Sequence, residues 1–223
     1  DHIGGAGLLF SDQSLGLTFG DVWFNAPPDP KVRGVAEGQS LAALLGAPKA
    51  VLPWNVAFQG ANVVAPEGNF VELPAPEGAP RITLLSPTPS HLATLFRVWG
   101  RELERLRKKE SAKPPAPATA TRGVTTLDPR ALAAKATAVD RAPANGSSIA
   151  FLLEHRGASV LLAADAFPAV LEPALQALAR YRKLPGALKL DAFKLSHHGS
   201  RANVTTGLLN AVQADHYIVS SNG

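Results

Sequence analysis

Three groups of polar residues in this chain are of the types that bind metal ions or transfer protons. Asp1 and His2 precede a Gly-Gly pair, Asp165 follows the apolar run "SVLLAA", and His197 and His198 follow the apolar run "LKLDAFKL". Carboxylates and neutral imidazoles are ligands for zinc and manganese, and a metal-bound water loses its proton near neutral pH. These residues therefore predict a metal-dependent hydrolytic site, provided that the fold brings them together.

Each group also has a purely structural interpretation. An aspartate after a strand often closes a turn or caps a helix, and one histidine of an adjacent pair can be a buried donor while the other is exposed. Successive residues at a strand end tend to point to opposite sides. His197 and His198 are therefore not expected to fill equivalent positions on one metal, so we expect one to bind while the other faces the substrate.

The elements that must position these residues can be read from the apolar pattern. Strands are predicted at 15–27, 80–87, 187–196 and 216–221, helices at 37–48, 88–110, 168–183 and 204–213, and a hairpin with an "HRG" turn at 147–166. Strands alternate with helices, which predicts a layered α/β or α+β fold with ligand residues on loops at strand ends. Ser200 and Asn203 are expected to cap the helix that follows them.

Composition limits the remaining possibilities. The chain has 223 residues, of which 46% are hydrophobic, so one domain with a sizeable core is expected, with a Pro/Ala-rich linker or insertion at 111–123. It has no cysteine, so a thiolate zinc site and a disulfide framework are excluded. The net charge of +4 allows an anionic substrate. No apolar run is long enough for a membrane span and no signal peptide is visible, so a cytoplasmic location is expected.

The motifs together resemble those of the metallo-β-lactamase superfamily, in the branch that includes the hydrolase domain of competence DNA-uptake proteins and the phosphorylcholine esterases. "DHIGGA" is similar to the second half of that family's HxHxDH motif, "LLAADA" to its LLxGD motif and "KLSHHGS" to its HHGS motif. "SSIAFLLE" and "DVWFN" are also similar, so the resemblance covers nearly the whole chain. Ala164 departs from it, because the family usually has Gly there. The family's HxH would precede Asp1 and its final HP pair would follow "SSNG", so we expect a domain over 1–223 that is incomplete at both ends.

The resemblance implies a four-layer αββα sandwich of mixed sheets and two divalent ions, zinc or else manganese. Asp1 and His2 would bind the second metal, Asp165 would bridge both, and His198 would bind the first. His197 and Asp1 are the expected catalytic residues, with His197 facing the substrate as an acid or as a donor to a phosphoryl oxygen.

The implied reaction is attack by a bridging hydroxide on a phosphodiester, in a small molecule or a nucleic acid. Two alternatives stay open: a hydrolase of the same fold that acts on a lactone, amide or thioester, and a non-catalytic binding module. The sequence indicates no protein partner.

Overall fold

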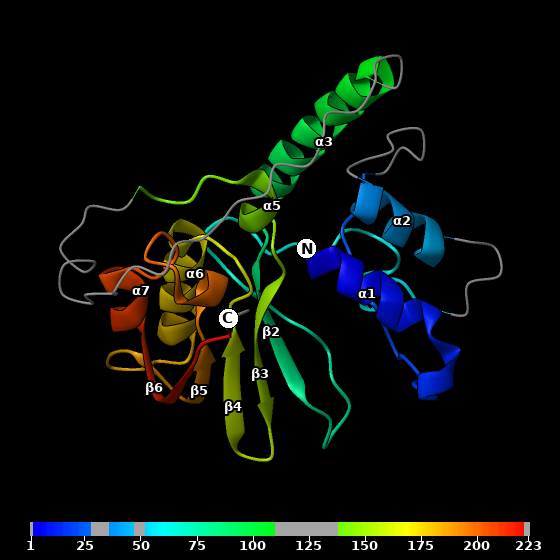
Figure 1. The fold of residues 1–223 in the computed structure, drawn as a ribbon. Coiled ribbons are helices and arrows are strands. Elements are labelled where there is room, and N and C mark those ends of the chain that lie inside the picture. Colours follow the sequence, from blue (N-terminus) through cyan, green and yellow to red (C-terminus); the bar gives the residue numbers. More distant parts are fainter. Residues whose placement is uncertain (1, 28–35, 47–51, 110–137, 221–223) are drawn as a thin grey trace, which may run out of the picture.

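The structure, a computed structural model, describes residues 2–27, 36–46, 52–109 and 138–220, and it combines helices with one six-stranded mixed sheet (Figure 1). The order of strands across the sheet follows the chain: β1 (Val71–Glu72), β2 (Arg81–Ser86), β3 (Ala150–His155), β4 (Ala158–Leu162), β5 (Leu188–Lys194) and β6 (Val212–Ile218). Strands β1 to β4 pair antiparallel, whereas β4, β5 and β6 pair parallel.

The parallel half of the sheet sets the position of the candidate site. Parallel neighbours need a crossover connection, and here α6 (Pro168–Tyr181) joins β4 to β5 while α7 (Thr206–Ala211) joins β5 to β6. The carboxyl ends of the three strands consequently lie at one edge of the sheet. Asp165, His197 and Ser220 follow those three ends in turn.

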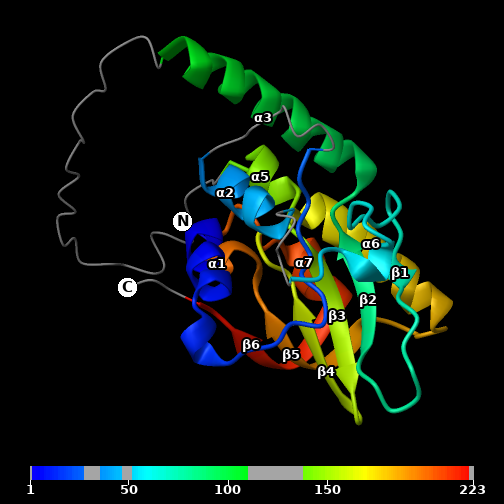
Figure 2. The same ribbon diagram turned by 90° about the vertical axis from the view of Figure 1, so that its right-hand side faces the viewer.

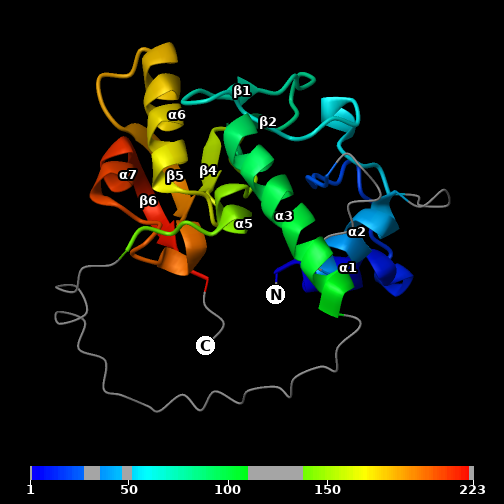
Figure 3. The same ribbon diagram turned by 90° about the horizontal axis from the view of Figure 1, so that it is seen from above.

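The main core lies between this sheet and α6, the helix expected at 168–183. One face of α6 is apolar and buried (Val170, Leu171, Ala174, Leu175 and Leu178). It packs against buried strand residues, among them Leu85, Leu152, Leu161, Leu190 and Phe193. Seen from the side and from above, α6 and α7 lie on one side of the sheet and α1 (His2–Ser11) and α2 (Ala36–Leu45) on the other (Figures 2 and 3).

The opposite face of β2 is covered as well. Leu84 is as fully buried as its neighbour Leu85, but it packs with Val63 and Ala65 in a separate cluster rather than in the main core. Trp23 extends this cluster through an edge-on contact with the ring of Phe151 on β3. Both faces of β2 therefore make apolar contacts, which accounts for the adjacent leucines at positions 84 and 85.

The strand predicted at 15–27 is wrong. In that stretch the structure has the short helix η1 (Gln13–Leu15) and a single bridge between Val22 and Trp54. Side chains replace a strand ladder: the Phe24 N–H donates to the carbonyl oxygen of the Asn55 side chain at 3.0 Å. The side chain of buried Asn25 accepts from the N–H of Val63 at 2.7 Å and donates to its carbonyl at 2.9 Å. Side chains thus satisfy the backbone groups of Phe24 and Val63 in place of a neighbouring strand.

Helix α3 (Pro89–Lys109) starts where the sequence predicts and runs out beyond the sheet (Figure 1). Its first turns are anchored by buried Leu92 and Trp99, while Arg97 and Arg101 are exposed.

No helix within the described ranges has the length and apolar character needed to cross a membrane. The linker predicted at 111–123 lies outside the described residues. Among the described residues, the remaining short helices are η2 (Val56–Phe58), α5 (Pro143–Gly146) and η3 (Ser196–Gly199).

Candidate functional site

The segment after β5 turns sharply at the two histidines. The φ values of His197, His198 and Gly199 are 46°, 56° and 77°. They lie in the left-handed region, which residues other than glycine rarely occupy. The His197 N–H donates to the Ala164 carbonyl at 2.8 Å, and Asp165 is the next residue. This bond joins the loop after β5 to the loop after β4. A backbone held in such a rare conformation by its surroundings is a frequent property of functional sites.

The imidazole of His197 is held by acceptors on its Nδ1 side. Nδ1 lies 3.1 Å from Oδ2 of Asp140 and 3.0 Å from Oδ1 of Asn203. Because both partners are acceptors, the network assigns the proton to Nδ1 and the lone pair to Nε2. The amide nitrogen of Asn145 is also near, at 3.3 Å from Nδ1, and it makes a shorter bond of 2.7 Å to Asp140.

Asp140 is the charged centre of this network, and only 10% of its side chain is exposed. Oδ1 accepts from the Ala142 N–H at 2.9 Å, and Oδ2 accepts from Asn145, Asn203 and His197. Burial alone would raise the pKa of Asp140. The hydrogen bonds from Ala142, Asn145, Asn203 and His197 outweigh it and hold the pKa below its ordinary value. The carboxylate is therefore charged at neutral pH.

Asn203 ties this network to the Asp165 loop. Its side chain is fully buried, and its amide nitrogen donates to Asp140 at 3.0 Å and to the backbone carbonyl of Asp165 at 3.2 Å. With its amide oxygen on His197, Asn203 contacts three separate chain segments at once. A buried amide with its hydrogen bonds satisfied fixes those segments relative to one another.

The expectation that Asn203 and Ser200 cap the following helix is wrong. Thr205 is the N-cap of α7, where its hydroxyl accepts from the Leu208 N–H at 3.1 Å. Ser200 instead accepts from the Ala202 N–H at 3.3 Å within its own turn. This frees Asn203 for the network around His197.

The imidazole of His198 is oriented by Ser220, which follows the end of β6. Its Nδ1 lies 3.0 Å from the backbone oxygen of Ser220 and 3.1 Å from the Ser220 hydroxyl. The carbonyl can only accept, so the proton is on Nδ1 and the lone pair on Nε2, which is the usual arrangement of a metal-binding histidine. The rings of His197 and His198 are inclined at 66° with centroids 6.0 Å apart. The two imidazoles thus have different partners and different orientations.

The structure places three of the five predicted site residues at one edge of the sheet. Asp165, His197 and His198 lie there on the loops after β4 and β5. His2 is the first residue of α1, but its side chain is outside the described part of the structure, and Asp1 is outside the described residues. Within the described part of the chain, no three His, Asp or Glu side chains gather closely enough to hold a metal ion.

The donors at this edge nevertheless suit a metal such as zinc or manganese. They are a carboxylate and an imidazole whose lone pair is on Nε2, and both metals accept nitrogen and oxygen ligands. The sequence predicts Asp1 and His2 as further ligands. Metal binding therefore stays a prediction, and the types of the donor atoms are compatible with it.

Sequence reasoning missed Asp140 and Asn145. Both precede strand β3, and they contact His197 from 57 and 52 residues away along the chain. The signal available was weak: an Asp and an Asn shortly before the "SSIAFLLE" run. Polar residues at the start of a buried strand are common in turns, so this pattern alone does not indicate chemistry.

Comparison of the chain with protein-family models, with curated proteins and with solved structures found no match. The similarity of "DHIGGA", "LLAADA" and "KLSHHGS" to metallo-β-lactamase motifs therefore remains a sequence-based expectation. The candidate site is defined by the hydrogen-bond geometry around His197 and by its position at the carboxyl ends of the parallel strands.

Proposed function

We propose that this protein is a metal-dependent hydrolase whose active site lies where β4, β5 and β6 end, and whose substrate is a phosphodiester. The observation that carries the proposal is the network in which Asp140 and Asn203 hold His197, with Asn203 also bound to the Asp165 loop. A charged carboxylate that fixes the tautomer of a half-buried histidine is the usual support of a general acid or base.

Asp165 and His198 are the described residues that would hold metal, with Asp1 and His2 as the further expected ligands. Two zinc or manganese ions, when bound, would supply Lewis acidity and an activated water. The Ser220 carbonyl would keep His198 in the tautomer that binds through Nε2.

The chain's own contribution centres on His197. Asp140 accepts a hydrogen bond from Nδ1, which leaves Nε2 to take up or release a proton. Asp140 keeps the ring in place, so that His197 can pass a proton from Nε2 to the leaving alkoxide of a phosphodiester. With its proton on Nε2, the same imidazole can donate to a phosphoryl oxygen and stabilise the charge that develops there.

The proposal extends to the fold. We infer that the six-stranded sheet with α6 and α7 forms one half of a four-layer αββα sandwich. The burial of Leu84 and Leu85 on opposite faces of β2 supports this inference, because a layer packs on each side of that strand. The net charge of +4 is compatible with an anionic substrate.

The test combines metal content with turnover. Protein purified without chelator is analysed for metals and assayed with bis(p-nitrophenyl) phosphate, with and without added Mn²⁺ or Zn²⁺. We expect bound divalent metal and hydrolysis that a chelator abolishes. His216→Ala is the matched control for His197→Ala, since His216 is exposed on β6 away from the network and should keep the wild-type rate.

Three results would contradict the proposal. Full activity after removal of metal would exclude the metal mechanism. Cleavage of lactones or thioesters without cleavage of any phosphoester would assign another substrate class. Bound metal with no hydrolysis of any of these would indicate a binding module.

A further inference from the structure

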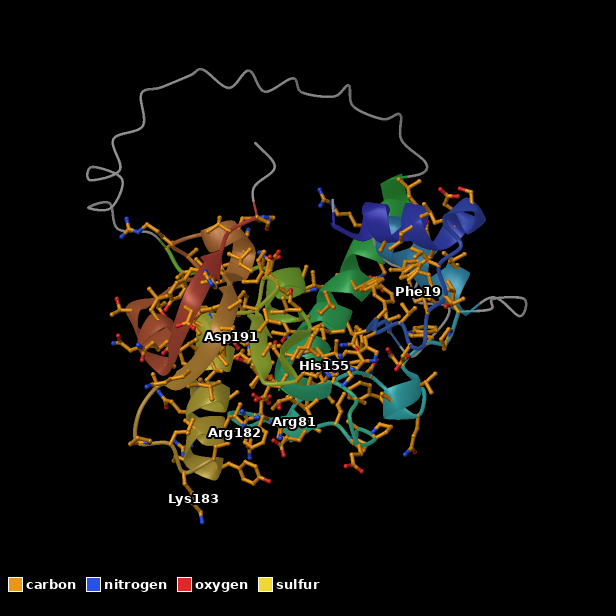
Figure 4. All side chains as sticks on the ribbon, turned by 90° about the horizontal axis from the view of Figure 1, so that it is seen from below. Phe19, Arg81, His155, Arg182, Lys183 and Asp191 are labelled. Carbon is orange, nitrogen blue, oxygen red and sulfur yellow. The ribbon has the colours of Figure 1, made fainter. Side chains whose placement is uncertain are left out.

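A hollow in the protein surface lies at the edge of the sheet opposite the candidate site, around the turn between β3 and β4. It has a volume of about 460 Å³ and is lined by charged and polar residues from the four strands β2 to β5 and the β3–β4 turn: Arg81, Glu154, His155, Arg156, Ser159 and Lys189. Figure 4 views the molecule from this edge, with Arg81 and His155 close together and Arg182 beside them. This hollow, called the turn pocket below, takes no part in the proposed catalytic site.

The turn pocket has an excess of positive charge. Arg81, Arg156 and Lys189 line it, against the single carboxylate of Glu154. That carboxylate is already bound by Arg182, which does not line the pocket, through two hydrogen bonds of 3.0 and 2.6 Å. Arg81 makes a longer contact of 3.4 Å with the same group and is 68% exposed. Arg182 therefore pairs with the carboxylate of Glu154 from outside the pocket, and it also lies 3.7 Å from the carboxylate of Glu72.

The other cations keep their charge available. Among the described residues, no carboxylate forms an ion pair with Arg156 or Lys189. Asp191 is the neighbouring acid on β5, and its carboxylate accepts from both the N–H and the hydroxyl of Ser159, at 2.6 and 2.7 Å. Asp191 therefore keeps its negative charge beside the pocket, but it is hydrogen-bonded to Ser159 and forms no ion pair with Arg156 or Lys189.

The turn itself holds Arg156 at the pocket. Arg156 and Gly157 have φ values of 50° and 83°, the pattern of a tight hairpin turn that favours Asn or Asp before Gly. An arginine in this conformation is uncommon, and the turn fixes the base of its side chain on the pocket wall. The guanidinium of Arg156 is a planar fork of donors that matches the oxygens of a phosphate group.

We propose that the turn pocket binds a small, multiply charged oxyanion such as a phosphomonoester or pyrophosphate. Three cations line the pocket against one carboxylate, which Arg182 also binds, and the volume is in the range of small-ligand sites. The proposal does not rest on the hydrolase proposal, because the pocket lies at the amino ends of β4 and β5 and the candidate active site at their carboxyl ends.

The test is a calorimetric titration of the protein with pyrophosphate at low salt. Arg156→Asn and Lys189→Gln each remove one charge from the turn pocket, and both positions are exposed. Asn tolerates the left-handed backbone, so Arg156→Asn should keep the turn. Lys183→Asn is the matched control: Lys183 also has a positive φ, of 55°, and is exposed at the end of α6 outside the pocket (Figure 4).

We expect each pocket variant to weaken pyrophosphate binding about tenfold, as the loss of one charge-assisted contact would, and the control to change it less than twofold. Absence of saturable binding would overturn the proposal, and so would equal weakening by Lys183→Asn, which would indicate diffuse charge attraction. A single-stranded oligonucleotide that binds through Arg156 and is not displaced by pyrophosphate would assign the surface to nucleic acid instead. Because binding is measured and not turnover, these outcomes are independent of catalysis.

Discussion

Replacement of Asp140 by Asn tests the network around His197 directly. The change keeps the shape of the side chain and removes its charge. Oδ1 can still accept from Ala142, but Oδ2 loses its charge-assisted bonds from Asn145, Asn203 and His197, all at 2.7–3.1 Å. Each such bond contributes roughly 1.5 kcal/mol, and bonds to one atom are not additive. We therefore expect Asp140→Asn to lower the free energy of unfolding at pH 7 by about 2–4 kcal/mol.

The pH dependence of this loss follows from the pKa of Asp140. The pKa is lower in the folded protein than in the unfolded chain, so the stabilisation is complete above the unfolded value of about 4. It is lost as the pH falls through the folded pKa, because the wild-type carboxyl is then neutral as well. The difference in stability between wild type and Asp140→Asn should therefore shrink as the pH is lowered below about 4.

The measurement is urea unfolding followed by tryptophan fluorescence, at pH 7 and at the lowest pH at which the wild type is still folded. Asp215→Asn on β6 is the control, because Asp215 is exposed and a substitution there should change the free energy of unfolding by less than about 0.5 kcal/mol. A loss for Asp140→Asn as small as that of the control would refute the reasoning, as would a loss that is the same at both pH values.

Two further predictions concern the loops beside this network. Ala164 is exposed with a φ of 47°, so Ala164→Gly should raise the free energy of unfolding by about 0.5–1 kcal/mol. The reason is that relief of roughly 1–2 kcal/mol of backbone strain exceeds the entropy that glycine adds to the unfolded chain. A lower melting temperature for Ala164→Gly would contradict this prediction. His198→Ala should reduce the metal content, whereas His197→Ala should keep the metal and lower turnover about 10²–10⁴-fold, as measured by elemental analysis and initial rates side by side. Normal metal and normal rates in both would mean that the histidines are surface residues, and the inverse result would exchange their roles.

Helix α6 and the β3–β4 hairpin could be predicted from local pattern, whereas β6 begins at Val212, inside the helix expected at 204–213. The buried face of α6 at Val170, Leu171, Ala174, Leu175 and Leu178 follows helical spacing, and the "HRG" turn lies where β3 meets β4. In these segments the burial of apolar residues and the local backbone preference favour the same structure. The parallel pairing of β4, β5 and β6 then brings Asp165, His197 and His198 to one edge.

The first half and the polar network could not be predicted in this way. Residues 15–27 alternate like a strand, but the side chain of Asn55 binds the backbone of Phe24, 31 residues away, and the side chain of Asn25 binds the backbone of Val63, 38 residues away. Asn203 has the sequence position of a helix cap, yet Thr205 fills that role two residues later. In each case a side chain pairs with a group that only the tertiary fold brings near, so the local sequence does not contain the signal.

The reach of Asn203 along the chain also bears on how the molecule folds. Its bonds to Asp165 and Asp140 close loops of 38 and 63 residues, whereas the β3–β4 hairpin closes over a two-residue turn. Loop closure costs entropy that must be met before the contact forms, so local pairings precede distant ones. The hairpin can form early, but the network around His197 can close only once β4, α6 and β5 are already in place. A partly folded molecule can therefore have most of its sheet and still lack the candidate site.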